Sequence, residues 1–133
     1  MNKHGIIHTD GGARGNPGPA GVGVVIKFGG QKKLFKKFIG HATNNQAEYQ
    51  GVILALEKSR ELGLETLDIF LDSELVQRQL NQEYKIKDKD LGKLFVRIWN
   101  LKLYFKKITY NHIYREDNKE ADRLVNRAID EAT

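Results

Sequence analysis

The chain has 133 residues, of which 40% are hydrophobic, and this size fits a single domain over residues 1–133 with one core. It has no cysteine, which excludes disulfide bonds, zinc–thiolate sites and a cysteine nucleophile, and which agrees with the reducing cytoplasm in which we expect the protein. No apolar run approaches the roughly 18 residues of a membrane span, so we expect no membrane partner, and the net charge of +5 points modestly to a polyanion such as nucleic acid.

Three strands are predicted first along the chain. The first covers residues 3–9, the second 21–28 and the third 31–39, with Gly29-Gly30 as a hairpin turn between the last two. The stretch HTDGGARGNPGPAGVGVV holds six of the thirteen glycines and both prolines, and we expect these residues to connect the first strand to the second. Three consecutive strands predict an antiparallel meander.

A long helix and a fourth strand follow. The segment TNNQAEYQGVILALEKSRELG predicts a helix, in which Thr43 and Gln46 form a capping box and Gly63 marks the end. The segment TLDIFL predicts a short strand over 66–71, which ends at Asp72.

The rest of the chain predicts three more helices and one strand. Residues 73–80 and 91–105 are helical in pattern, 107–113 form a last strand, and 118–132 form a final helix capped by Asp117, with Glu120 three residues on. The order βββαβααβα adds two parallel strands to the meander through right-handed crossovers. The sequence therefore predicts an α/β fold with a mixed sheet of five strands flanked by helices.

Four carboxylates stand out by their positions in these elements. Asp10 and Asp72 follow strands, while Glu48 and Asp122 lie on helix sides whose neighbours at helical spacing are small or apolar. Each acid alone has an ordinary explanation as a turn residue, a cap or half of an ion pair. Together they can converge on one point, where their repulsion calls for a hard divalent cation such as Mg²⁺ or Mn²⁺.

Four blocks of the sequence resemble type 1 ribonuclease H. They are TDGGARGNPGPAGVGVVI, TNNQAEYQGVILAL, LDSELV and HIYREDNKEADRLVNRA, in the family's order and over nearly the whole chain. The resemblance implies a ribonuclease H-like fold and hydrolysis of the RNA strand of RNA/DNA hybrids, with 5′-phosphate and 3′-hydroxyl products. It also implies that the four carboxylates, Asp10, Glu48, Asp72 and Asp122, hold two Mg²⁺ ions about 3.5–4 Å apart, with Asp10 between them and Mn²⁺ as a substitute.

Small and amide side chains carry the implied substrate contacts. The residues in question are Gly11, Gly12, Asn16, Asn44, Asn45 and Gln46. Glycines allow backbone groups to approach the ribose, and amides suit the wide minor groove and 2′-hydroxyls of an A-form-like duplex. The alternatives are a plain hairpin loop for the glycine-rich stretch and helix-start chemistry for the amides, which weighs equally with substrate contact for Gln46.

The sequence departs from the family in two places. Many members carry a basic insertion before the third helix, whereas NQEYKIKDKDLGK is short and mixes lysines with aspartates, so we expect a compact form without this basic protrusion. The family's mobile histidine, ten residues before the last carboxylate, falls on His112, but the expected glycines are missing and Arg115 is an alternative occupant of the loop.

Three other functions compete with a stand-alone hybrid nuclease. The first is a catalytically silent module that binds hybrid or duplex, which the four carboxylates argue against because they would repel phosphates. The second is a nuclease domain of a larger protein such as a reverse transcriptase, against which the start at Met1 argues. The third is cleavage of double-stranded RNA as a side activity. We expect a monomer.

Overall fold

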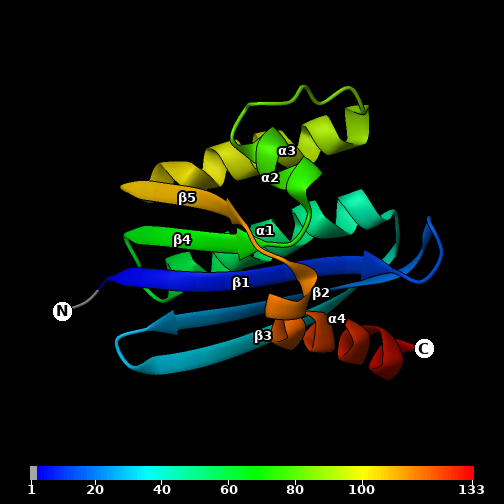
Figure 1. The fold of residues 1–133 in the computed structure, drawn as a ribbon, viewed down its shortest axis with the longest axis horizontal. Helices are drawn as coiled ribbons and strands as arrows, with labels where there is room; N and C mark the ends of the chain where they lie inside the picture. Colours follow the sequence, from blue (N-terminus) through cyan, green and yellow to red (C-terminus); the bar gives the residue numbers. More distant parts are fainter. Residues whose placement is uncertain (1–2) are drawn as a thin grey trace.

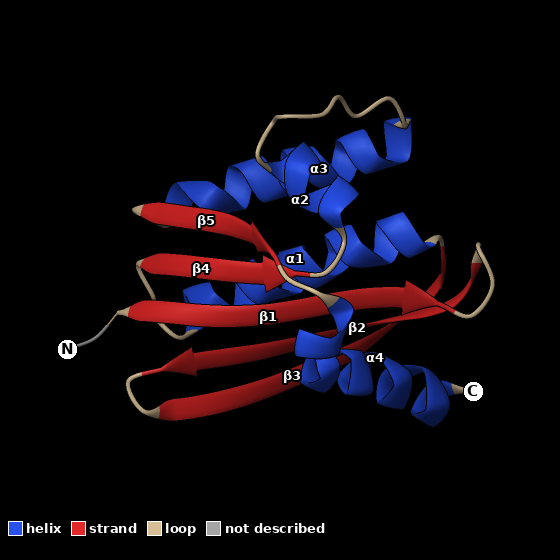
Figure 2. Cartoon of the chain, in the orientation of Figure 1, coloured by secondary structure: helices blue, strands red, loops and turns tan. Residues whose placement is uncertain are grey.

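The computed structural model describes residues 3–133, which form one five-stranded sheet with helices on both faces (Figures 1 and 2). The strands are β1 (His4–Ala13), β2 (Gly18–Phe28), β3 (Gln31–Ala42), β4 (Thr66–Leu71) and β5 (Lys107–His112). The helices are α1 (Asn44–Glu61), α2 (Glu74–Leu80), α3 (Lys89–Leu101) and α4 (Lys119–Ala132), with short 3-10 turns η1 (Lys102–Tyr104) and η2 (Arg115–Asp117). The predicted element order and the five-stranded mixed sheet are confirmed.

The strand order in the sheet is β3-β2-β1-β4-β5. The first three strands form the antiparallel meander, and β4 and β5 add parallel pairs beside β1. The parallel pairing of β1 with β4 stops at His8 opposite Phe70, while the antiparallel pairing with β2 continues to Ala13 opposite Ala20. The last residues of β1 therefore have a strand on one side only, and this opens the sheet at the point where β4 ends.

Two helical layers cover the sheet. Helices α1 and α3 lie together on one face, and α4 lies on the other face across β1, β2 and β3 (Figure 2). The main core, between the sheet and α1, includes Ile7, Val24, Val52 and Ile69, none of which is exposed to solvent. Helix α4 approaches β2 at Gly23, where an added Cβ would lie 2.6 Å from the Cβ of Leu124.

The glycine-rich stretch differs from its prediction. Strand β1 runs on to Ala13 and β2 begins at Gly18, so only residues 14–17 connect the two strands. The backbone N–H of Arg14 donates to the carbonyl of Pro19 (2.8 Å) across this turn. Most of these glycines therefore belong to the sheet, because the pairing of β1 with β2 continues through them. Several of them lie where a helix packs closely against the strand backbone.

Two helix boundaries also differ from the sequence-based expectation. The third helix ends at Leu101 and continues as the 3-10 turn η1, rather than reaching Phe105 as one helix. Asp117 does not cap the last helix, because it belongs to η2, and the N-cap residue of α4 is Asn118, whose side chain makes no capping bond.

The predicted start of α1 is confirmed in detail. The Thr43 hydroxyl oxygen accepts from the Gln46 N–H (3.1 Å), and the Gln46 side-chain oxygen accepts from the Thr43 N–H (2.9 Å). Gly63 follows the helix with a φ of 74°, the left-handed conformation that favours glycine. Among residues 3–133, no helix combines the length and the apolar character that crossing a bilayer requires.

Candidate active site

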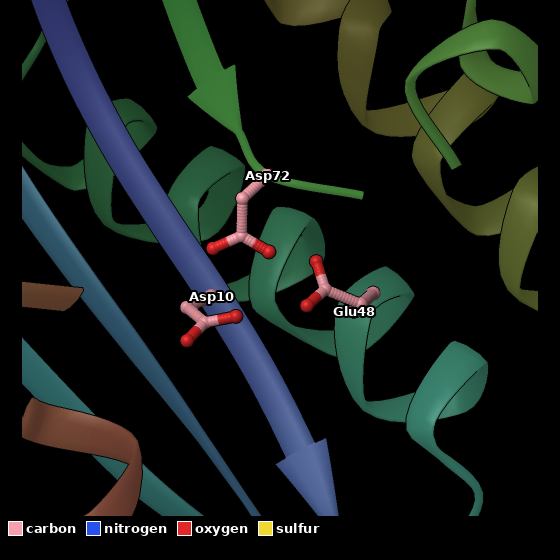
Figure 3. A group of neighbouring side chains, drawn as sticks. All are labelled: Asp10, Glu48 and Asp72. Carbon is pink, nitrogen blue, oxygen red and sulfur yellow. The ribbon is translucent and has the colours of Figure 1, made fainter. Parts of the chain in front are cut away.

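Three carboxylates meet at the opened edge of the sheet. One oxygen from each of Asp10, Glu48 and Asp72 lies within 4.8 Å of the other two, and Figure 3 shows the three groups pointing toward one another. Asp10 comes from β1, just beyond its last pairing with β4, and Asp72 is the first residue after β4. Glu48 comes from the second turn of α1. Elements far apart in the sequence thus deliver three negative charges to one point.

Gly11 sets the distance between α1 and this edge of the sheet. An added Cβ on Gly11 would collide with the backbone carbonyl of Ala47 and lie 2.6 Å from the backbone nitrogen of Glu48. The prediction that Gly11 allows backbone groups to approach the ribose stays untested, and the contact found here is with α1. Gly12, by contrast, is half-buried, and an added Cβ there would meet only Val125 at 3.7 Å.

Hydrogen bonds leave part of the carboxylate cluster without protein partners. The Gly11 N–H donates to Asp10 Oδ1 (2.9 Å) and also lies 3.3 Å from Glu48 Oε1. Both acids are 7% exposed, and Glu48 Oε2 is fully buried with no hydrogen-bond partner among residues 3–133. Because a buried carboxylate oxygen is costly unless it is paired, this donor set fits a hard divalent cation.

Electrostatics supports the same interpretation. Burial, reinforced by the negative charges of Asp72 and Asp122, raises the pKa of Asp10 to about 7. Burial and the neighbouring Asp10 raise the pKa of Glu48 well above its usual range. A cation in the cluster would remove this repulsion and restore the ionised form of both acids.

The fourth predicted carboxylate, Asp122, lines the same cleft but lies outside the three-carboxylate cluster. Its negative charge contributes to the raised pKa of Asp10. The cleft has a volume of about 410 Å³. Its lining residues are Asp10, Gly11, Gly12, Ala13, Arg14, Asn44, Asn45, Glu48, Asp72, Ser73, Arg115, Asp122, Val125, Asn126 and Ile129.

The predicted substrate-binding amides fall into two groups. Asn44 and Asn45 line the cleft, whereas Asn16 and Gln46 do not. Asn16 Oδ1 accepts from the Asn44 N–H (3.0 Å), and Asn44 Oδ1 accepts from the Ala13 N–H (2.9 Å), so these side chains hold the turn after β1 against the start of α1. The amide oxygen of Gln46 is engaged in the capping box.

The two candidates for the last loop lie in different surroundings. His112 is the last residue of β5, exposed and outside the cleft lining, with its ring 6.0 Å from that of Tyr114. Arg115, in η2, lines the cleft and has no ion-pair partner within the described part of the chain.

Sequence reasoning missed Asn118, which is 1% exposed and touches the carboxylate cluster. Its side-chain nitrogen donates to Asp72 Oδ2 (3.0 Å). In the sequence, an asparagine at the start of a helix indicates an N-cap. This local pattern gives no indication that the side chain contacts a carboxylate 46 positions earlier in the chain.

Comparisons with known proteins agree with this geometry. A family model described as reverse transcriptase-like matches residues 8–128. The bifunctional protein Rv2228c of Mycobacterium tuberculosis is 42% identical over 130 residues, which are 96% of this chain and 36% of that protein, so the chain spans about a third of its length. Ribonuclease HI of Halobacterium salinarum is 39% identical over 98% of this chain and 68% of its own length.

A solved structure extends the similarity to the whole fold. The crystal structure of LC11-RNase H1 in complex with an RNA/DNA hybrid is 44% identical, with a TM-score of 0.90 over 96% of this chain and 98% of that chain.

Proposed function

Because the chain belongs to the type 1 ribonuclease H family, we propose that it is an endoribonuclease that hydrolyses the RNA strand of RNA/DNA hybrids through two metal ions, leaving 5′-phosphate and 3′-hydroxyl ends. The observation that carries this proposal is the cluster of Asp10, Glu48 and Asp72 at the open edge of the sheet, in which Asp10 and Glu48 are buried and Asp72 is half-buried. A module that only binds nucleic acid gains nothing from clustered negative charge, which repels phosphates.

The four carboxylates, Asp10, Glu48, Asp72 and Asp122, would hold the ions, with Mg²⁺ as the expected metal and Mn²⁺ as a substitute. When bound, the ions supply an activated water and stabilise the leaving 3′ oxygen. The protein's own contribution is orientation, because the Gly11 N–H donates to the Asp10 carboxylate and lies close to that of Glu48.

Hybrid recognition falls to the rim of the cleft. Asn44, Asn45 and Gly12 line it beside the carboxylates, and Asn16 and Gln46 support the start of α1 from outside it. Amide groups donate and accept hydrogen bonds, which suits 2′-hydroxyls and does not select base sequence. We expect cleavage with little base preference that needs several consecutive ribonucleotides.

Turnover calls for a group that releases product, and His112 and Arg115 are the two candidates. The family's spacing supports His112, whereas Arg115 is supported by its guanidinium on the cleft wall, which has no ion-pair partner among residues 3–133. We further propose a monomer that works in the cytoplasm, where a chain without cysteine meets no obstacle.

Cleavage of labelled RNA/DNA, RNA/RNA and DNA/DNA duplexes, each with and without Mg²⁺, tests the proposal. We expect Mg²⁺-dependent cutting of the RNA strand in the hybrid, with end analysis giving 5′-phosphate products. Efficient cutting of the all-DNA duplex would refute the substrate assignment. Comparable cutting of RNA/RNA would extend it to double-stranded RNA.

A further inference from the structure

One buried asparagine, Asn118, joins the three segments that carry Asp10, Asp72 and Asp122. The side-chain nitrogen of Asn118 donates to the carbonyl oxygen of Thr9, the residue before Asp10, and to Asp72 Oδ2, both at 3.0 Å. The backbone carbonyl oxygen of Asn118 accepts a hydrogen bond from the backbone N–H of Asp122 (3.1 Å) in the first turn of α4. This single residue therefore contacts β1, the end of β4 and the helix of the fourth carboxylate.

We propose that Asn118 is a positioning residue, which orients the Asp72 carboxylate and holds α4 against β1 so that the carboxylates form one metal site. This inference rests on the proposed metal-dependent nuclease function.

The chemistry of the contact favours asparagine over similar side chains. Both partners, a backbone carbonyl and a carboxylate, only accept hydrogen bonds, and the amide nitrogen offers two protons, one for each. Aspartate at this position would set oxygen against oxygen, and serine would supply a single proton. The Asn118 side chain therefore supplies one N–H donor for each of its two acceptors, Thr9 O and Asp72 Oδ2.

The role does not reduce to helix capping. The side chain of Asn118 makes no capping bond to α4, and its Oδ1 atom is buried with no hydrogen-bond partner in the described part of the chain. An unpaired buried oxygen lowers stability, so the residue is poorly suited to a purely structural task. The engaged amide nitrogen fixes one oxygen of Asp72 and leaves the other free for a cation.

Metal binding measured without substrate tests the inference on Asn118→Ala. Asn111→Ala is a matched control, because the Asn111 amide also donates two bonds, to Ile69 O (3.3 Å) and to Thr109 Oγ1 (2.9 Å), but donates to none of the four carboxylates. Loss of a residue that orients a metal ligand weakens binding by about 10-fold or more. We expect such a loss of Mn²⁺ affinity, by calorimetry, in Asn118→Ala only.

Kinetics adds a second readout. For Asn118→Ala we expect the Mg²⁺ concentration at half-maximal cleavage to rise by about 10-fold, with little change in KM for the hybrid. Equal Mn²⁺ affinity in wild type and Asn118→Ala would overturn the inference. If the wild type binds Mn²⁺ but leaves hybrid intact, the proposed function fails, while the affinity comparison still decides the role of Asn118.

The wild-type protein supplies a readout if Asn118→Ala does not fold. In a ¹⁵N-labelled sample, the side-chain amide signals of Asn118 should shift on titration with Mg²⁺, because their acceptor Asp72 becomes a metal ligand. The side-chain signals of Asn111 should stay in place. Unchanged Asn118 signals at saturating Mg²⁺ would contradict the proposal.

Discussion

At Gly11 the backbone of α1 fills the space that a side chain would need, and the neighbouring Gly12 has no such constraint. We predict that Gly11→Ala pushes α1 and Glu48 away from β1. It should lower the free energy of unfolding by about 1–3 kcal/mol, and kcat should fall with it. Thermal unfolding and steady-state cleavage measure both effects.

Gly12→Ala is the matched control for this effect, because it adds the same methyl group one residue along. Its melting temperature should stay close to that of the wild type, and any change should appear in KM for the hybrid. If Gly11→Ala melts and cleaves like the wild type, α1 does not depend on the missing side chain.

The raised pKa of Asp10 predicts a stability that depends on pH in the absence of metal. The pKa is about 7 in the folded protein, against a reference value of 3.8, so the folded state binds the proton more tightly. This contribution is complete below about pH 4 and is lost as the pH rises through 7. Asp10→Asn removes the titrating charge with little change in volume and should abolish cleavage.

Melting curves in EDTA at two pH values check this prediction. At pH 8, Asp10→Asn should be more stable than the wild type by about 1–4 kcal/mol, and at pH 4 the two should be similar. A variant less stable than the wild type at pH 8 would show that the Asp10 charge is not destabilising, and a wild-type cleavage rate would end its assignment as a metal ligand.

Arg115 and His112 give opposite expectations for turnover. Arg115 lines the cleft without an ion-pair partner among the described residues, so its guanidinium can contact a phosphate there. We predict that Arg115→Ala lowers kcat by about 10-fold, the effect of losing a charge-assisted hydrogen bond. The measurement is kcat, KM and melting temperature for each single variant.

His112→Ala is the comparison for this prediction. His112 is exposed at the end of β5, so its loss should change kcat less than that of Arg115. A fall in kcat at constant KM in His112→Ala alone would instead support the assignment from family spacing. Changes below about two-fold in both variants, which correspond to less than about 0.5 kcal/mol, would exclude both from turnover.

At the scale of elements, the start of α1 presents two neighbouring amides with different surroundings. Asn44 accepts a bond from Ala13, whereas the Asn45 side chain has no hydrogen-bond partner within residues 3–133. We predict that Asn45→Ala weakens hybrid binding by about 1–3 kcal/mol and leaves the melting temperature unchanged. Binding to a hybrid with the metal site inactivated by Asp10→Asn measures this directly.

Asn44→Ala provides the contrast, because it removes a bond that links α1 to the end of β1 and should lower the melting temperature as well. If Asn45→Ala binds hybrid as tightly as its parent, the α1 amides do not read the 2′-hydroxyls.

At the scale of the whole molecule, the carboxylate cluster couples metal binding to folding. Mg²⁺ binds the folded arrangement of acids and not the unfolded chain, so it should raise the melting temperature in a concentration-dependent way. EDTA should abolish cleavage and leave the far-ultraviolet circular dichroism unchanged, because the core of Ile7, Val24, Val52 and Ile69 does not involve the metal. Full activity in chelator would contradict the metal-dependent mechanism.

The sequence by itself determined the elements and their order, because these depend on local patterns. Apolar and β-branched runs marked the strands, Thr43 and Gln46 marked the start of α1, and a paired glycine marked the hairpin. The acids of the candidate site stood out because Asp10 and Asp72 follow apolar strands and Glu48 lies among apolar helix neighbours. Periodicity encodes such positions directly.

Only the tertiary structure decided how these elements approach one another. The extension of β1 to Ala13 depends on pairing with β2, and the need for glycine at Gly11 depends on the backbone of α1. The hydrogen bonds of Asn118 connect it to Thr9 and Asp72, which lie 109 and 46 positions earlier in the sequence. The place of Arg115 on the cleft wall depends on the path of the chain between β5 and α4. Contacts between segments distant in sequence leave no periodic signal, because each segment satisfies its own local rules whichever partner it meets.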